Sequence, residues 1–404
     1  MRVITGIAIL QLLALSTNAQ SFDSRHLAVD AQFFGGKIIP HSPTVRNALD
    51  RSGAAIYGIG IGYQTLPSDS SVYASAYNYP LLGLRFSISD FKRIRLSENS
   101  RLGNIYSIYG HIERTLARNT RWLFFYTLDA GLSYATDPHD WISNPGNPFV
   151  GSRLMVYVGG GFGVNYKVSS KVVFGLSAGL HHYSNGRLGM PNSGINMFGT
   201  TFNVRYYFDT CPDAFPKITG SGFKKEWQYH ISAGMGYQTS LQEWEIDLNG
   251  AQEDRRTHYS LRPKFSLSAD AMYRYTRKFA AGLGFDMFYT PHTNLLRAWD
   301  IMMFPKARFD TLKYSRIALG LSVNHEIYYR NVSLNASFGY YLFRQVGIHD
   351  KEHFYQRAGF RYYMPMLRNM FIGVAIKAHR FSQAEYLEMS IGIKFTKPSK
   401  KWSK

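Results

Sequence analysis

The segment from His182 to Asn185 carries residue types that can cleave an ester. His182 and Ser184 are separated by one residue, so on a β-strand their side chains project from the same face. There a histidine can take the proton of a serine hydroxyl, which turns the hydroxyl into a nucleophile toward a carbonyl carbon. Side-chain amides can donate hydrogen bonds to the resulting oxyanion. This pattern predicts a serine hydrolase site.

The strands on either side of the segment put it on an apolar face. Along residues 172–184 every second side chain is apolar, and the same set continues to His182 and Ser184. Asn196 begins the matching apolar set of residues 196–208. The apolar members of the two sets are Val172, Phe174, Leu176, Ala178 and Leu180, then Phe198, Phe202, Val204, Tyr206 and Phe208. Polar side chains on a lipid-facing surface cost free energy, so three of them together indicate a function.

Alternation of apolar with small or polar residues recurs along most of the chain. In residues 227–238 the odd positions are mostly apolar, and the even positions are Gln, His, Ser or Gly. Interiors this polar are typical of transmembrane β-barrels and not of soluble sandwiches. We therefore expect an all-β, antiparallel, up-and-down barrel fold. The predicted strands are 27–37, 54–64, 79–89, 104–116, 121–134, 153–166, 172–184, 196–208, 227–239, 259–275, 278–289, 315–329, 332–344, 354–364, 371–381 and 386–396.

These strands form two sets of eight, separated by a stretch rich in Pro and Gly. One interpretation is two consecutive eight-stranded barrels, residues 20–210 and 227–404, joined by a linker at 211–226. A single barrel of about sixteen strands accommodates the same pattern. The two architectures predict different interiors, because a sixteen-stranded barrel can hold a water channel, whereas side chains fill an eight-stranded one.

The N-terminus and the charge indicate where the protein works. Residues 1–19 resemble a cleaved signal peptide, with basic Arg2, an apolar run and Ala19 before the cut, so the mature chain is expected to begin at Gln20. The net charge of +19 is consistent with an acidic partner and equally with charges that only solvate turns and loops. For an exported bacterial protein, the phosphates of lipopolysaccharide are more accessible as a partner than nucleic acid. The single cysteine, Cys211, forms no disulfide framework and has no metal-site spacing around it. We expect a bacterial outer-membrane protein.

The stretches His182-Tyr-Ser-Asn-Gly and Pro191-Asn-Ser-Gly-Ile-Asn resemble the PagL-type lipid A 3-O-deacylases, which are small outer-membrane barrels. The resemblance covers about residues 25–210. It implies that His182 is the general base and Ser184 the nucleophile, and that Asn185 and Asn192 are oxyanion donors. The implied reaction releases a 3-hydroxy fatty acid from lipid A without cofactor or metal.

The third catalytic position departs from the family pattern. Asn196 stands where the family has an acidic residue. An amide oxygen can accept the imidazole N–H and set the tautomer, but it brings no charge to stabilise the imidazolium. Asp137 and Asp140, from a neighbouring predicted loop, are candidates to supply that acid.

Three other interpretations remain open at the level of sequence. The chain could be a non-catalytic porin or scaffold with a degraded hydrolase motif, or a phospholipase that uses the same serine. His379 and Ser382 repeat the His and Ser types in the second half, but their parity puts them on opposite faces unless a bulge intervenes. His181 has inward parity and is expected to be an ordinary interfacial residue.

Overall fold

The computed structural model describes most of the chain. The described residues are 26–49, 52–67, 71–97, 100–211, 222–251, 253, 255–256, 259–304, 312–349, 352–367, 369–381 and 383–398. The predicted signal peptide and residues 212–221 of the predicted linker lie outside them. Among the described residues no helix has the length and apolar character needed to cross a membrane.

The chain forms two closed, antiparallel barrels of eight strands each, in which sequence neighbours pair and the last strand pairs with the first. The first barrel consists of β1 (Leu27–Ile38), β2 (Gly53–Gln64), β3 (Leu81–Asp90), β4 (Asn104–Arg118), β5 (Trp122–Ala135), β6 (Leu154–Lys167), β7 (Val172–Ser184) and β8 (Ile195–Tyr207). The second consists of β9 (Glu226–Thr239), β10 (Leu261–Arg274), β11 (Phe279–Tyr289), β12 (Ile317–Tyr329), β13 (Val332–Phe343), β14 (Phe354–Tyr363), β15 (Met370–His379) and β16 (Gln383–Pro398).

This architecture confirms the two-barrel prediction and excludes a single barrel of sixteen strands. Every strand predicted from alternation is present, with ends that differ from the prediction by at most three residues. The short helices are α2 (Pro43–Ala48), α3 (Val72–Ala76), α4 (Leu241–Asn249) and α5 (Thr293–Met303), with a 3-10 turn at Gly347–His349.

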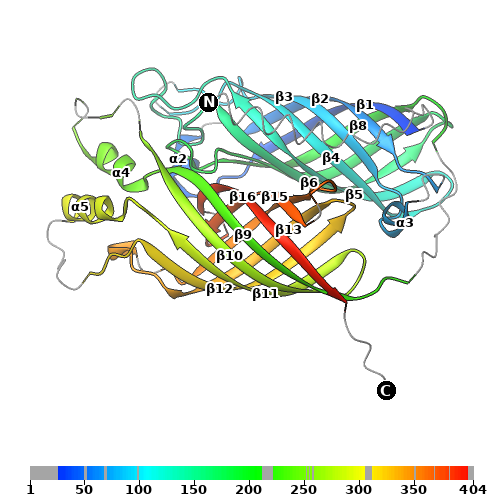
Figure 1. The fold of residues 1–404 in the computed structure, drawn as a ribbon. Helices are drawn as coiled ribbons and strands as arrows, with labels where there is room; N and C mark the ends of the chain where they lie inside the picture. The colour runs from blue at the N-terminus through cyan, green and yellow to red at the C-terminus, as the bar shows by residue number, and fades with distance from the viewer. Residues whose placement is uncertain are drawn as a thin grey trace.

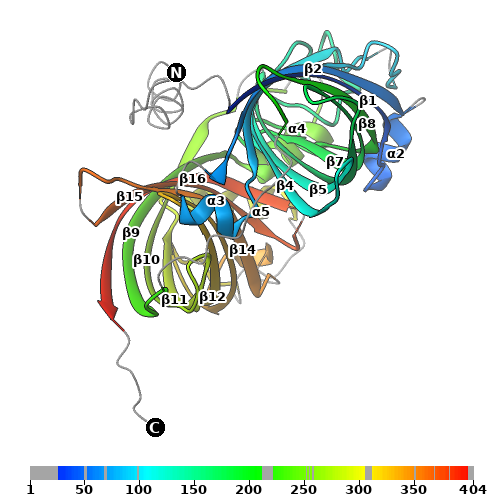
Figure 2. The same ribbon diagram turned by 90° about the vertical axis from the view of Figure 1, so that its right-hand side faces the viewer.

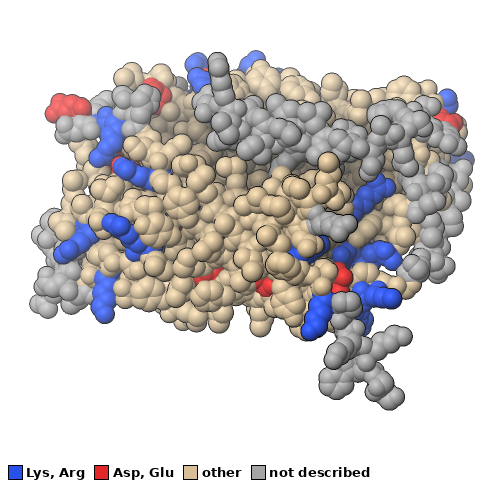
Figure 3. Space-filling model, in the orientation of Figure 1, with Lys and Arg blue, Asp and Glu red and all other residues tan. Residues whose placement is uncertain are grey.

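The two faces of the barrel walls differ in the way that lipid requires. Outward side chains such as Leu180, Ile231 and Val323 are more than half exposed, although they are aliphatic. In Figure 3 charged side chains gather mainly toward the two ends, with a largely uncharged band between them. An apolar belt between charged rims is the surface that a membrane-embedded barrel presents.

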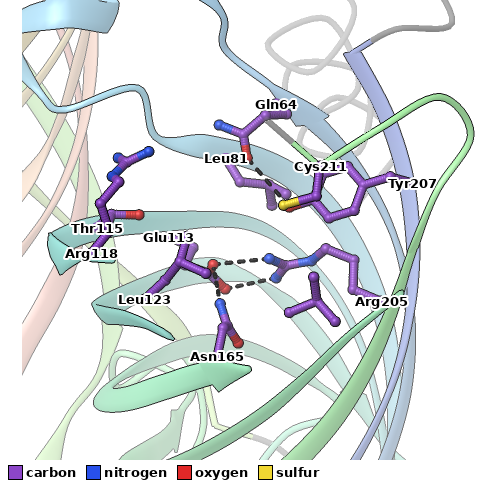
Figure 4. Close-up of a pocket in the computed structure, with 11 residues that line it drawn as sticks. Gln64, Leu81, Glu113, Thr115, Arg118, Leu123, Asn165, Arg205, Tyr207 and Cys211 are labelled. Atoms are coloured by element: carbon purple, nitrogen blue, oxygen red, sulfur yellow. Dashed lines mark hydrogen bonds and ion pairs between the residues drawn. The ribbon is translucent and has the colours of Figure 1, made fainter. Parts of the chain in front are cut away.

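The interior of the first barrel is filled by paired charges. Arg205 donates two hydrogen bonds to Glu113, at 2.9 and 2.6 Å, and Asn165 donates a third at 2.8 Å (Figure 4). Arg85 donates a hydrogen bond to Asp30 and forms an ion pair with it inside the same barrel. Buried charges are tolerated when they are paired and hydrogen-bonded in this way. The barrel is thus packed with its own side chains, as expected for eight strands.

Cys211 follows β8, the last strand of this barrel. It lies buried beside the pocket of Figure 4, where it packs with Leu81, Val173 and Tyr207. Its role in the described structure is that of a small apolar residue.

The barrels lie side by side and meet at both ends (Figures 1 and 2). We call the end with α2, α4 and α5 the site end, and the end with α3 the turn end. At the turn end Tyr77 donates a hydrogen bond to the carbonyl of Tyr328, at 2.8 Å. At the site end Trp141 of the first barrel stacks on Trp244 of α4, with ring centroids 4.6 Å apart.

Loops at the site end form an apolar plug over the first barrel. One buried cluster contains Val45 of α2, Phe91, Phe149 and Ile195, together with inward side chains of the barrel wall. The loop between β7 and β8 is tied to the loop between β5 and β6, because the amides of Ser193 and Gly194 donate to carbonyls of the latter. The plug therefore gives the β7–β8 loop a firm support.

Candidate functional site

His182 and Asn196 lie directly opposite each other on β7 and β8, as one cross-strand pair. Their neighbours on the same face, Leu180 and Phe198, are 55% and 53% exposed, whereas Tyr183 of opposite parity is fully buried. His182, Asn196 and Ser184 are all half-buried. All three side chains therefore lie on the outer face, as their parity predicts, and His182 and Asn196 contact each other there.

The histidine and the asparagine are joined by a short hydrogen bond. His182 Nδ1 lies 2.6 Å from Asn196 Oδ1. Because an amide oxygen can only accept, the imidazole proton resides on Nδ1, which leaves a lone pair on Nε2. This is the tautomer that a general base needs.

Asp137 and Asp140 do not take the place of the missing acid in the described structure. Asp137 forms an ion pair with Arg101 at 2.5 Å. Asp140 accepts hydrogen bonds from Ser143 and the Ile142 amide in its own turn. In the described structure the side-chain partner of His182 is therefore an amide.

Ser184 ends β7 and is surrounded by amides. Its Oγ lies 3.3 Å from Nδ2 of Asn192 and accepts a hydrogen bond from the backbone amide of Gly186 at 3.2 Å. The Ser184 hydroxyl also donates to Oδ1 of Asn192 at 3.4 Å, so among the described residues its hydrogen bonds run to Asn192 and Gly186 and not to His182. Catalytic hydrogen bonds are often loose in free enzymes and tighten with substrate, so this arrangement is compatible with catalysis.

The side chains of Asn185 and Asn192 make different contacts. The side chain of Asn185 is buried, donates to the Gly189 carbonyl at 3.0 Å and accepts from the Arg187 amide at 2.8 Å. It braces the loop, and what Asn185 turns toward the site is its backbone amide, which donates to Asn192 Oδ1 at 3.2 Å. Asn192, by contrast, presents its side chain directly to the serine.

Gly194 allows the returning chain to pass close to the site. Its φ of +69° favours glycine, and a Cβ there would lie 3.2 Å from Cε1 of the His182 ring. Any side chain at this position would crowd the imidazole between its two nitrogens.

The second barrel also touches the loop that follows the serine. Thr239, the last residue of β9, donates its backbone amide to the Arg187 carbonyl at 2.8 Å and its hydroxyl to the Leu188 carbonyl at 3.1 Å. A Cβ built on Gly186 would meet Ile376 and Leu387 of β15 and β16 at 3.3 and 3.4 Å. The loop that carries the Gly186 amide is thus held between the two barrels.

Two contacts of the site were not expected from sequence. His41, in the segment between β1 and α2, lies with Nδ1 3.1 Å from Asn196 Nδ2. Thr239 lies in the other barrel. Neither belongs to a local motif with the residue that it contacts, so alternation gives no signal for them.

The remaining histidines of interest lie away from the site. His181 faces the interior, where its ring nitrogen lies 2.6 Å from the Tyr157 hydroxyl, as its parity predicts. His379 points into the second barrel beside Tyr341 and Glu385. Ser382 lies outside the described residues. Within the part of the chain that the structure describes, no group of three or more His, Cys, Asp or Glu is arranged to hold a metal ion.

Comparison with known families agrees with the resemblance and extends it. The family model described as "Lipid A 3-O-deacylase (PagL)" matches residues 57–205. A second model, "Acyloxyacyl hydrolase, C-terminal domain", matches residues 227–397, the part of the chain that the resemblance seen in the sequence does not cover. No curated protein matches the chain.

Two solved structures resemble parts of the chain. The outer membrane enzyme PagL has 16% identity and a TM-score of 0.29, and the match covers 43% of this chain and 97% of that one. Neisserial surface protein A has 14% identity and a TM-score of 0.30, with 45% and 97% covered. The family models divide the chain as its fold does, with one model for each barrel. The first barrel therefore matches the lipid A 3-O-deacylase (PagL) family model, and the second barrel matches the model of the acyloxyacyl hydrolase C-terminal domain.

Proposed function

We propose that this protein is an outer-membrane lipid A 3-O-deacylase with Ser184 as nucleophile and His182 as general base. Nε2 of His182 takes the hydroxyl proton while Ser184 Oγ attacks the carbonyl carbon of the ester at position 3 of lipid A. When the tetrahedral intermediate collapses, the bond to the sugar oxygen breaks and His182 returns the proton to that oxygen. Water then releases the 3-hydroxy fatty acid from the serine by the same steps. The reaction needs neither a cofactor nor a metal.

The oxyanion has three candidate donors. They are the side-chain amide of Asn192 and the backbone amides of Asn185 and Gly186, all directed at the Ser184 hydroxyl or its immediate partner. Such fixed donors are worth more on the protein than in water, since they need no reorganisation when charge develops. Asn185 thus stays in the proposed oxyanion hole through its backbone.

The observation that carries the proposal is the position of the catalytic pair. His182 and Ser184 lie on the outer, apolar face of the barrel, beside the exposed Leu180. A lipid embedded next to the barrel can reach them, whereas a solute in the interior cannot. The excess of basic residues, 46 Lys and Arg against 27 Asp and Glu, favours a phosphorylated lipid such as lipopolysaccharide.

The test is mass spectrometry of lipid A from cells that express the wild type, Ser184→Ala or Ser177→Ala. Ser177 lies on the same strand with inward parity, so Ser177→Ala controls for expression and insertion. We expect loss of one 3-hydroxyacyl chain with the wild type and with Ser177→Ala, and an intact pattern with Ser184→Ala. The same acyl pattern for Ser184→Ala and the wild type would refute the deacylase.

The same cells also distinguish the deacylase from two rival functions. A non-catalytic barrel would release no fatty acid from any lipid, with or without Ser184. A phospholipase would leave lipid A intact and release fatty acid from glycerophospholipids in a manner that depends on Ser184. The second outcome would keep the site and change the substrate.

A further inference from the structure

We propose that His41 is a positioning residue, which fixes the orientation of the Asn196 amide and thereby the tautomer of His182. The inference rests on the proposed function of His182 as a base. Asn196 donates through Nδ2 to His41 Nδ1 at 3.1 Å, while its Oδ1 accepts from His182 at 2.6 Å. Three side chains from three separate elements thus form one hydrogen-bonded row.

The need for such a partner follows from the chemistry of an amide. A carboxylate presents two equivalent acceptors to a histidine, so it has no wrong orientation. An asparagine has an acceptor on one side and a donor on the other. With its amide turned around, Asn196 would offer Nδ2 to His182, and the imidazole proton would move to Nε2. That tautomer cannot accept the proton of Ser184.

In the orientation that the structure shows, His41 Nδ1 is the acceptor for the Asn196 amide nitrogen. A neutral imidazole with its proton on Nε2 has a lone pair on Nδ1, which accepts from the amide nitrogen and not from the amide oxygen. With His41 in that tautomer, the hydrogen bonds of the row His41–Asn196–His182 are all formed in only one orientation of the Asn196 amide. His41 supplies the acceptor that an asparagine needs in order to act in place of an acid.

The backbone holds His41 in reach. The amide of Ile39 donates to the carbonyl of Asn196 at 2.8 Å, two residues before His41. On the other side, Ser42 caps α2 by accepting from the Val45 amide at 3.2 Å, with Pro43 as the first helical residue. Val45 is buried in the plug. The histidine is thus fixed between a strand contact and a docked helix.

A double-mutant cycle tests the proposal on the full-length protein. His41→Ala is measured in the wild-type background and together with Asn196→Asp, which keeps the size of the side chain and removes the distinction between its two ends. We expect His41→Ala to lower kcat at least about tenfold in the wild type with little change in KM. In the Asn196→Asp background we expect a change of less than about twofold.

Further variants separate positioning from a structural role. His41→Gln offers an amide oxygen as acceptor and is expected to recover part of the activity. Arg46→Ala, on the exposed side of α2, controls for disturbance of the segment. The ¹⁵N shifts of His182 report its tautomer directly, and we expect the Nδ1-protonated form in the wild type and a mixture in His41→Ala.

Two outcomes would overturn the role of His41. One is an equal loss of activity from His41→Ala in both backgrounds, and the other is an unchanged His182 tautomer in His41→Ala. Either outcome would leave the proposed function standing. The proposed function is refuted by a different result, namely full activity of Ser184→Ala.

Discussion

Ser184 has amide groups around it, and the side chain that bonds His182 among the described residues is an amide as well. Such a site relies on orientation more than on charge. In the proposed mechanism Asn196 sets the tautomer of His182 but cannot neutralise the imidazolium, so we expect the oxyanion donors to supply much of the transition-state stabilisation. This makes Asn192 the residue whose loss we expect to be most costly after the catalytic pair itself.

At the scale of single residues, we predict that Asn192→Ala and Asn192→Asp both lower kcat by on the order of 10²–10³-fold, while KM changes little. Both variants remove the Nδ2 donor, and the aspartate also keeps the shape of the side chain. The measurement is steady-state hydrolysis of detergent-solubilised lipid A by the purified protein. Full activity of Asn192→Asp would show that the side chain is not an oxyanion donor.

A second prediction at this scale concerns the missing acid. Asn196→Glu restores the carboxylate that the family has, and we expect the rate to rise if stabilisation of the imidazolium limits turnover. The same lipid A assay measures the change. No gain in rate, with a correctly inserted variant, would mean that another step limits the enzyme.

The β7–β8 loop is the element on which the site depends. Within the loop the Asn185 side chain bridges to Gly189, and on one side Ser193 and Gly194 bond the β5–β6 loop. On another side Thr239 of the second barrel holds the carbonyls of residues 187 and 188. The amides of residues 185 and 186 are therefore positioned by contacts from both barrels.

At the scale of elements, we predict that Thr239→Val lowers kcat about threefold to tenfold, because the loop loses its hydroxyl anchor at Leu188. Thr293→Val is the matched control. Its hydroxyl donates to the Thr290 carbonyl at 2.8 Å, at the same end of the second barrel but within that barrel. Lipid A hydrolysis should fall in the first variant and not in the second, and equal rates would argue against a role for the second barrel in positioning.

The whole molecule consists of two barrels that run side by side and meet at each end (Figure 1). Both interiors are filled with their own paired charges, such as Arg205 with Glu113 in the first and Arg357 with Asp286 in the second. At the site end the contact is aromatic, with His139 and Trp141 packed on Trp244. This contact joins the loops of the first barrel to α4 of the second.

At this largest scale, we predict that the contact between the barrels weakens in acid. Burial lowers the pKa of His139 from 6.5 to about 4 in the closed contact. An opened contact would return the pKa toward 6.5, so below that pH the open form binds more protons and is favoured. The stabilisation is present above pH 6.5 and is lost as the pH falls toward 4.

Hydrogen–deuterium exchange checks this prediction. After correction for intrinsic rates, α4 and residues 139–150 should be less protected at pH 5 than at pH 7. His139→Phe keeps an aromatic ring without a titrating group, and its protection should not depend on pH. The same pH dependence in this variant would assign the effect to another group.

The amino-acid sequence was enough to predict the strands, the all-β class and the shared face of His182, Ser184 and Asn196. Each of these follows from the two-residue period of a β-strand, which is a local property of the chain. It also indicated the family, because the residues around the serine are contiguous.

The closure of the strands and the contacts that hold the site could be seen only in the folded protein. Alternation is the same for one barrel of sixteen strands as for two of eight, and closure depends on which strand pairs with the first. The inward turn of the Asn185 side chain depends on how the loop folds. His41 lies 155 residues before Asn196, and Thr239 lies 51 residues after Leu188. Contacts over such separations are made by the packing of whole elements and leave no periodic trace in the sequence.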